Sequence, residues 1–209
     1  MSGRTPSFDE IQQTLKRSAA ALNAAGVDYV LAGGVACWAR GGSATASDLD
    51  YMVRPQDAER AREALVEAGL RAEHPPEEWL LKAWDGDVLV DLIFAPIGLV
   101  VDDELFERSP KLDVLGVSMN VMQVEDILVA RLLALHEHYL DLEPLIDIAR
   151  SAREQIDWAS LRRRTEASPY ARAFLVIVEG LGISSEAPDG PPHPGGLAPE
   201  GRRAPGYSA

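Results

Sequence analysis

The stretch that decides the fold is residues 31–53, LAGGVACWARGGSATASDLDYMV. It begins by completing a short apolar run, residues 28–32, which we expect to form a buried strand. Gly33 and Gly34 then interrupt the apolar pattern, and residues 35–40 predict the first turns of a helix. The order is therefore a strand, a glycine turn and a short helix.

The two glycines and the loop after this helix can surround an anion with polar groups. Because they have no side chain, Gly33 and Gly34 let the backbone approach a phosphate, and a helix N-terminus offers unpaired N–H groups. The loop, residues 41–47, carries Ser43 and Thr45, whose hydroxyls can reach phosphate oxygens. The simpler alternative is a plain turn followed by a surface loop, since Gly-Gly is common in turns.

A pair of carboxylates follows the loop. Residues 48–53, DLDYMV, alternate in polarity and predict a strand, so that Asp48 and Asp50 point to the same face. Two carboxylates so close repel each other unless a cation lies between them, and Mg²⁺ prefers carboxylate and phosphate oxygens. The alternative is an exposed strand edge or a helix cap, where an Asp-x-Asp pair is also found.

A third carboxylate, Asp91, interrupts an apolar strand in VLVDLIF. A carboxylate in such surroundings needs a partner, although an edge or strand-end position would also satisfy it. If this strand lies beside residues 48–53, the three aspartates converge. They can then hold two metal ions for displacement at phosphorus, with Asp91 orienting or deprotonating the acceptor.

Outward from this centre, the pattern predicts further helices and hairpins. Ser7 and Glu10 match a capping box before a helical run. The expected elements are a helix over residues 8–25, a helix over 56–68 after Pro55, a hairpin over 79–94 turning at Asp85-Gly86, and a hairpin over 111–122 around Gly116.

The second half reads as helical. Apolar residues recur at helical spacing from Val124, Asp141 and Asp157 are expected to cap two helices, and Ser168-Pro169 opens a last one ending at Gly180. We therefore predict an α+β fold with a small mixed sheet flanked by helices and a C-terminal helical region. The expected division is a domain over residues 7–122, helices over 123–182 and a disordered Pro/Gly-rich tail over 183–209.

Composition narrows the class of protein. The chain has 209 residues, a net charge of −13 and a single cysteine, Cys37, which excludes an intramolecular disulfide and suits a reducing cytosol. We see neither a signal segment nor a membrane-spanning run, so we expect a cytoplasmic protein without a membrane partner. The acidic balance argues against DNA, because nucleic-acid binding normally relies on basic surfaces.

The order of these motifs resembles the DNA polymerase beta-like nucleotidyltransferase superfamily. The resemblance rests on Gly33-Gly34, the short helix, Gly41-Gly42, Asp48 with Asp50, and Asp91. The helical half is similar to the region that follows the catalytic domain in abortive-infection-type toxin nucleotidyltransferases, and the motif spacing is similar to that of aminoglycoside nucleotidyltransferases.

The resemblance implies a nucleoside triphosphate such as ATP as donor, Mg²⁺ as cofactor, pyrophosphate as product and a hydroxyl-bearing acceptor, which is a small molecule, a protein or tRNA. Two features depart from the family pattern. The loop before Asp48 has no basic residue, and Arg131 stands where toxin-like members often have lysine. Lys82 and Arg131 are then the cations expected to bind the triphosphate, and the alternative for Lys82 is a solvated lysine on a strand. The alternative is a nucleotide-binding or interaction protein that kept the fold and lost turnover.

Overall fold

The computed structural model describes residues 4–42 and 48–184, which form a seven-stranded mixed sheet with helices on both faces. The strand order is β3-β4-β5-β2-β1-β7-β6. β2 runs parallel to β5 and antiparallel to β1, which in turn runs parallel to β7. The strands are β1 (Tyr29–Ala32), β2 (Asp48–Val53), β3 (Arg71–Glu73), β4 (Leu80–Asp85), β5 (Val88–Ile93), β6 (Lys111–Val114) and β7 (Val117–Val121).

One face of the sheet is covered by α1 (Phe8–Ala24) and α3 (Ala58–Glu67). A short 3-10 turn, η1 (Pro55–Asp57), precedes α3. A buried hydrogen bond of 2.8 Å between the hydroxyls of Ser18 on α1 and Tyr51 on β2 identifies this face. Because strand side chains alternate, Asp48 and Asp50 point to the opposite face.

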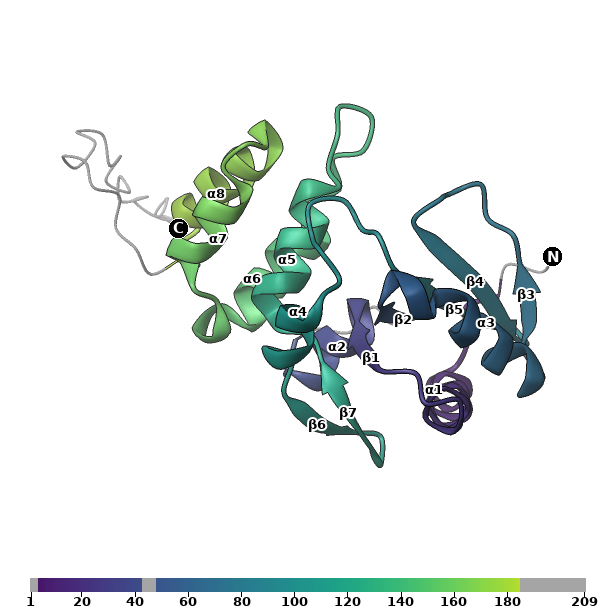
Figure 1. Cartoon of the computed structure of the whole chain (residues 1–209). Coiled ribbons are helices and arrows are strands. Elements are labelled where there is room, and N and C mark those ends of the chain that lie inside the picture. The colour runs from purple at the N-terminus through teal and green to yellow at the C-terminus, as the bar shows by residue number, and fades with distance from the viewer. Residues whose placement is uncertain (1–3, 43–47, 185–209) are drawn as a thin grey trace, which may run out of the picture.

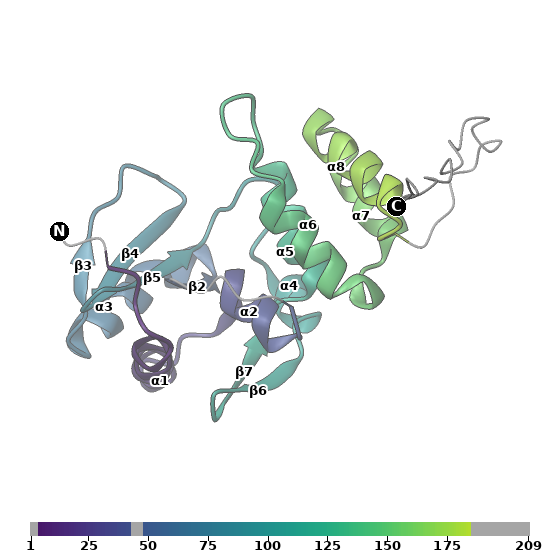
Figure 2. The same cartoon turned by 180° about the vertical axis from the view of Figure 1, so that it is seen from behind.

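The opposite face meets the helical half of the chain. α2 (Gly33–Ala39) follows β1 directly, and the later helices gather at one end of the molecule, away from β3 and β4 (Figure 1; Figure 2 shows the same from behind). They are α4 (Asp103–Glu107), α5 (Val124–Leu133), α6 (Glu143–Ser151), η2 (Arg153–Gln155), α7 (Trp158–Thr165) and α8 (Pro169–Gly180).

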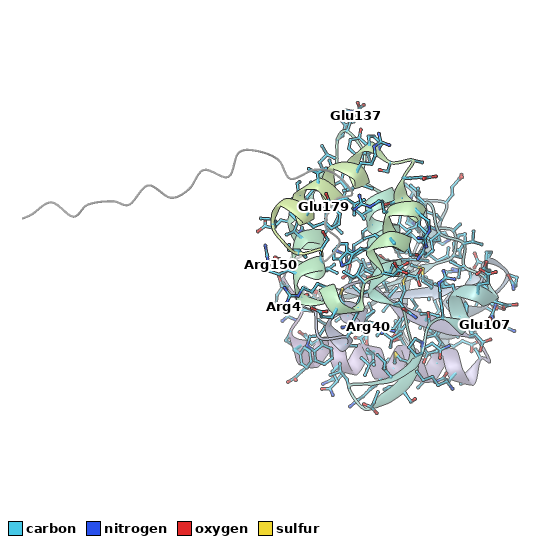
Figure 3. All side chains as sticks on the ribbon, turned by 90° about the vertical axis from the view of Figure 1, so that its left-hand side faces the viewer. Arg4, Arg40, Glu107, Glu137, Arg150 and Glu179 are labelled. Atoms are coloured by element: carbon cyan, nitrogen blue, oxygen red, sulfur yellow. The ribbon has the colours of Figure 1, made fainter. Side chains whose placement is uncertain are left out.

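Arg40, just after α2, ties the sheet to this helical end. Its guanidinium donates hydrogen bonds to the carbonyls of Met122 at 2.6 Å and Val121 at 2.7 Å, and its own carbonyl accepts one from Gln155 at 2.7 Å. Figure 3 views the molecule from the helical end and shows Arg40 below Arg150 of α6 and Glu179 of α8. Arg40 therefore has a structural role.

Several local predictions are confirmed. Ser7 and Glu10 form the reciprocal capping box of α1. Asp157 caps α7 by accepting from the Ser160 amide at 2.9 Å, and Ser168 caps α8. The hairpin around Gly116 is β6–β7, where Leu115 and Gly116 both have positive φ, as a tight hairpin turn requires.

Other local predictions are wrong. Asp141 is not a cap, because α6 begins at Glu143 and its N-cap is Leu142. The β4–β5 turn lies at Gly86-Asp87, since Asp85 still pairs with Val88 in the sheet. The short helix α2 begins at Gly33 itself rather than at residue 35.

Two short elements were not predicted from the pattern, β3 and α4. β3 has an exposed first residue and lies at the sheet edge, where burial imposes little alternation. α4 is a single short helix capped by Asp102, whose carboxylate accepts from the Leu105 amide at 3.1 Å.

The C-terminal boundary differs by a small amount from the expected tail. Ile183 is only 6% exposed and belongs to the hydrophobic core, so ordered packing continues past α8. Residues 185–209, most of the expected tail, lie outside the described residues. Within the described part, no helix has both the length and the apolarity needed to cross a membrane.

Candidate active site

Asp48, Asp50 and Asp91 come together on the sheet face that points away from α1. Asp50 on β2 and Asp91 on β5 are direct neighbours in the parallel register, and Asp48 lies two residues before Asp50 on the same face. One carboxylate oxygen from each residue lies within 4.8 Å of the other two. The strand order thus brings together the three carboxylates that the sequence pattern singled out.

The register extends this cluster into a row across five strands. Ala32 lies opposite Asp50, Asp91 lies opposite Lys82, and Lys82 lies opposite Glu73. The ammonium nitrogen of Lys82 is 3.8 Å from Oδ1 of Asp91, which is an ion-pair distance but too long for a hydrogen bond. Lys82 is therefore the cation beside the acidic cluster on the β4 side.

The three carboxylates change one another's ionisation. Burial, together with the charges of Asp48 and Asp91, raises the pKa of Asp50 to about 7, although Arg131 and Lys82 oppose the shift. Burial also raises the pKa of Asp91 to about 6, although Lys82 opposes the shift. Without a cation, keeping these carboxylates ionised in the folded protein thus costs free energy.

Gly33 is required by the position of Asp50. Its φ is +61°, and a Cβ atom built on it would lie 1.7 Å from Oδ2 of Asp50. The absence of a side chain at Gly33 therefore allows the start of α2 to lie close to the Asp50 carboxylate. Gly34 follows on α2 and is buried.

The donor set fits a divalent metal ion. Among residues 4–42 and 48–184, no group donates a hydrogen bond to the buried Oδ1 of Asp91. A buried carboxylate oxygen that accepts no hydrogen bond, beside two other carboxylates, is what a hard cation with oxygen ligands would satisfy. The triad can therefore bind a metal ion.

Arg131 on α5 lines two pockets that adjoin the acidic cluster. The first, of about 190 Å³, is mostly apolar and is lined by Ala32, Gly33 and Asp50 as well as by residues of α5. The second, of about 180 Å³, is lined by Gly34, Cys37, Glu143 and Asp147 among others. The guanidinium of Arg131 thus belongs to both.

The structure brings together some of the predicted site residues and not others. Asp48, Asp50, Asp91, Gly33 and Lys82 form one continuous group, with Gly34 and Arg131 bordering it. Ser43 and Thr45 lie outside the described residues. The lining of the first pocket was missed, although its strand residues have a simple signal: Met52 follows Asp50, and Ile93 follows Asp91, by two residues on the same face.

Comparison with solved structures shows the fold. The chain superposes on the solution structure of the antibiotic-resistance factor ANT(2'')-Ia with a TM-score of 0.53 and 21% identity, over 84% of this chain and 97% of that one. For ANT(2'')-Ia in complex with adenylyl-2''-tobramycin the TM-score is 0.51 and the identity 19%, over 79% and 97%. For the lincomycin-bound lincosamide adenylyltransferase LnuA the values are 0.49 and 13%, over 73% and 100%.

None of the curated protein sequences matches the chain. A family model described as "Uncharacterised nucleotidyltransferase" matches residues 9–179, which include the whole acidic cluster and most of the helical region. With most of the chain matched and the acidic cluster in place, this protein belongs to that nucleotidyltransferase family.

Proposed function

We propose that this protein transfers a nucleoside monophosphate from a nucleoside triphosphate, such as ATP, to a hydroxyl group of an acceptor, with Mg²⁺ as its metal. The observation that carries the proposal is the cluster of Asp48, Asp50 and Asp91 beside Gly33. Three converging carboxylates next to a glycine turn suit a metal-bound triphosphate.

The proposed roles follow from position. Asp48 and Asp50 would hold two metal ions, with Asp91 contributing to the binding of one of them. Such ions would neutralise charge on the phosphates and align the attacking and leaving oxygens. Asp91 would also accept the proton of the acceptor hydroxyl.

In this reaction the acceptor oxygen bonds to the α-phosphorus while the bond from that phosphorus to pyrophosphate breaks. Gly33, Gly34, Ser43 and Thr45 are proposed to seat the phosphates. Lys82 and Arg131 supply positive charge on two sides of the cluster, from β4 and from α5. Positioning and charge neutralisation then carry most of the rate enhancement.

The test is incubation of the protein with each labelled triphosphate, Mg²⁺ and either a cell extract, tobramycin or lincomycin. We expect label transfer to at least one of these acceptors with release of pyrophosphate, and loss of both in Asp50→Ala. Glu63→Gln, an exposed carboxylate on α3, is the matched control and keeps the activity. Transfer that persists in Asp50→Ala would refute the assignment.

A binding measurement, made beside the labelling experiment, separates an enzyme from a relative that binds nucleotide without turnover. Calorimetry with the triphosphate and Mg²⁺ reports binding independently of product. Binding without any labelled product, over long incubation with extract fractions of small molecules, protein and tRNA, would identify a nucleotide-binding protein instead.

A further inference from the structure

The first pocket, which we call the apolar pocket, lies between the sheet and α5. Its sheet side is formed by Met52 and Ile93, which are direct neighbours in the β2–β5 register. Its helix side is formed by Ile127 and Ala130 of α5 and by Ala134, which directly follows this helix. The pocket therefore includes the next pair on this face of the sheet, two residues along the strands from Asp50–Asp91.

The mouth of the apolar pocket keeps apolar side chains in contact with solvent. Trp79 is 37% exposed and Ile97 is 61% exposed, and both line the pocket together with Pro96. Inside, Met52 and Ile127 are 4% and 2% exposed. A buried apolar floor with an exposed apolar rim is typical of a ligand site.

The apolar pocket opens onto the acidic cluster. Gly33 and Asp50 belong to both, and besides Asp50 the only charged residue among the described lining is Arg131. A ligand that fills the pocket therefore has one end at the proposed metal site, while the rest of it contacts hydrocarbon and an aromatic ring.

The second pocket has more charged residues in its lining than the apolar pocket. Glu143 and Asp147 line it from α6, and Gly34 lies at its α2 side. Carboxylates accept hydrogen bonds from ribose hydroxyls and from base N–H groups. The second pocket therefore suits the nucleoside of the donor, which leaves the apolar pocket for the acceptor.

We propose that the acceptor is a small hydroxyl compound with an uncharged apolar body, a ring or an aliphatic chain, that fills the apolar pocket and presents its hydroxyl to Asp91. This inference rests on the proposed function, since it names the substrate class of the same site. A polycationic acceptor is disfavoured, because Asp50 is the one carboxylate among the described lining residues and is proposed to bind the metal. Further ammonium groups would lose hydration against Met52, Ile93 and Ile127.

The test measures binding, so that it does not depend on turnover. The full chain is loaded with Mg²⁺ and α,β-methylene-ATP, which cannot release pyrophosphate. Octyl β-glucoside below its micelle concentration, glucose and spermine are then titrated, with calorimetry and tryptophan fluorescence as readouts. We expect octyl glucoside to bind and to change the emission of Trp79, while glucose and spermine bind at least tenfold more weakly.

Two variants place the binding in the apolar pocket. Ala130→Leu fills the pocket from α5, and Ile97→Ser removes an exposed apolar contact at the rim; each is expected to weaken octyl glucoside at least fivefold. Ala20→Leu, the same change at an exposed position of α1, is the control. Circular dichroism checks that each variant is folded.

Three results would overturn the proposal: equal affinity for glucose and octyl glucoside, wild-type affinity in both variants, or displacement of octyl glucoside by the nucleotide, which would assign the pocket to the base. The proposed function fails separately, through label transfer that survives Asp50→Ala. Failure of one is thus distinguishable from failure of the other.

Discussion

Asp50 and Asp91 lie directly opposite each other on the adjacent parallel strands β2 and β5, each with a pKa raised by burial. Like charges facing each other across a sheet are destabilising unless something between them compensates. This relationship links the stability of the fold to the proposed function, because a cation that binds the pair also stabilises the folded state.

Asp50→Asn is expected to raise the melting temperature in EDTA and to remove the stabilisation by Mg²⁺. The amide keeps the shape of the side chain but ends the repulsion with Asp48 and Asp91. For the wild-type protein, a metal present at a hundred times its dissociation constant adds about 2.7 kcal/mol to the free energy of unfolding. Thermal denaturation with EDTA and with Mg²⁺ measures both effects. Glu63→Gln should behave as wild type, and a Mg²⁺ shift retained in Asp50→Asn would contradict the metal site.

The stability of the metal-free protein is expected to fall as pH rises from about 4 to about 7. Carboxyl groups in an unfolded chain have a pKa of about 3.9, whereas those of Asp50 and Asp91 are about 7 and about 6 in the folded state. Between these values the folded state binds more protons than the unfolded state, so raising the pH favours unfolding.

Urea denaturation in EDTA across this pH range measures the slope. The part of the slope due to these two groups should vanish in the double variant Asp50→Asn, Asp91→Asn. Saturating Mg²⁺ should reverse the trend, because the ion binds the ionised carboxylates. A slope unchanged in the double variant would place its origin elsewhere.

Gly33→Ala is expected to cost more stability than Gly26→Ala. Both glycines have a positive φ, +61° and +64°, so alanine is strained by about 1–2 kcal/mol at either position. Only at Gly33 does the new Cβ collide with a neighbour, Oδ2 of Asp50, whereas Gly26 has open space. The free energy of unfolding, measured with urea for both variants, separates backbone strain from the collision with Asp50. Equal losses in the two variants would show that the close approach is unimportant. Mg²⁺ binding should weaken in Gly33→Ala alone.

Asp126→Ala is expected to destabilise the protein by about 3 kcal/mol. The Asp126 carboxylate is 1% exposed and accepts from Arg108 at 2.9 Å and from Arg164 at 2.5 Å, which joins α5 to α7 and to the segment after α4. Its removal takes the ion pair from the partly buried guanidinium of Arg108 and leaves Arg164 with Glu125 alone.

The control for this variant is Asp147→Ala, which breaks the exposed pair with Arg150 and should cost well under 1 kcal/mol. Urea denaturation of both variants gives the comparison. Similar losses for the two variants would mean that the buried pair contributes no more than an exposed one.

Much of the local structure could be predicted because its determinants are near in sequence. The capping box of Ser7 and Glu10 and the Ser168-Pro169 start of α8 involve neighbouring residues, and each is present. Asp141 shows the limit: a residue of capping type lies next to a helix that begins two positions later, because Pro144 in the first turn suits a start at Glu143.

By itself, the sequence determined which residues are candidates for the proposed chemistry. It also determined which face each strand residue takes, because side-chain alternation is a property of the single strand. Thus Asp48 and Asp50 share a face whatever lies beside them. Only the tertiary structure decided that β5 pairs with β2 in the register that sets Asp91 opposite Asp50, with Lys82 beyond it on β4. It also decided that α5 returns over the same face to form the apolar pocket. The physical reason is that register and helix packing depend on contacts between segments far apart in the chain, which are selected by burial of the whole core.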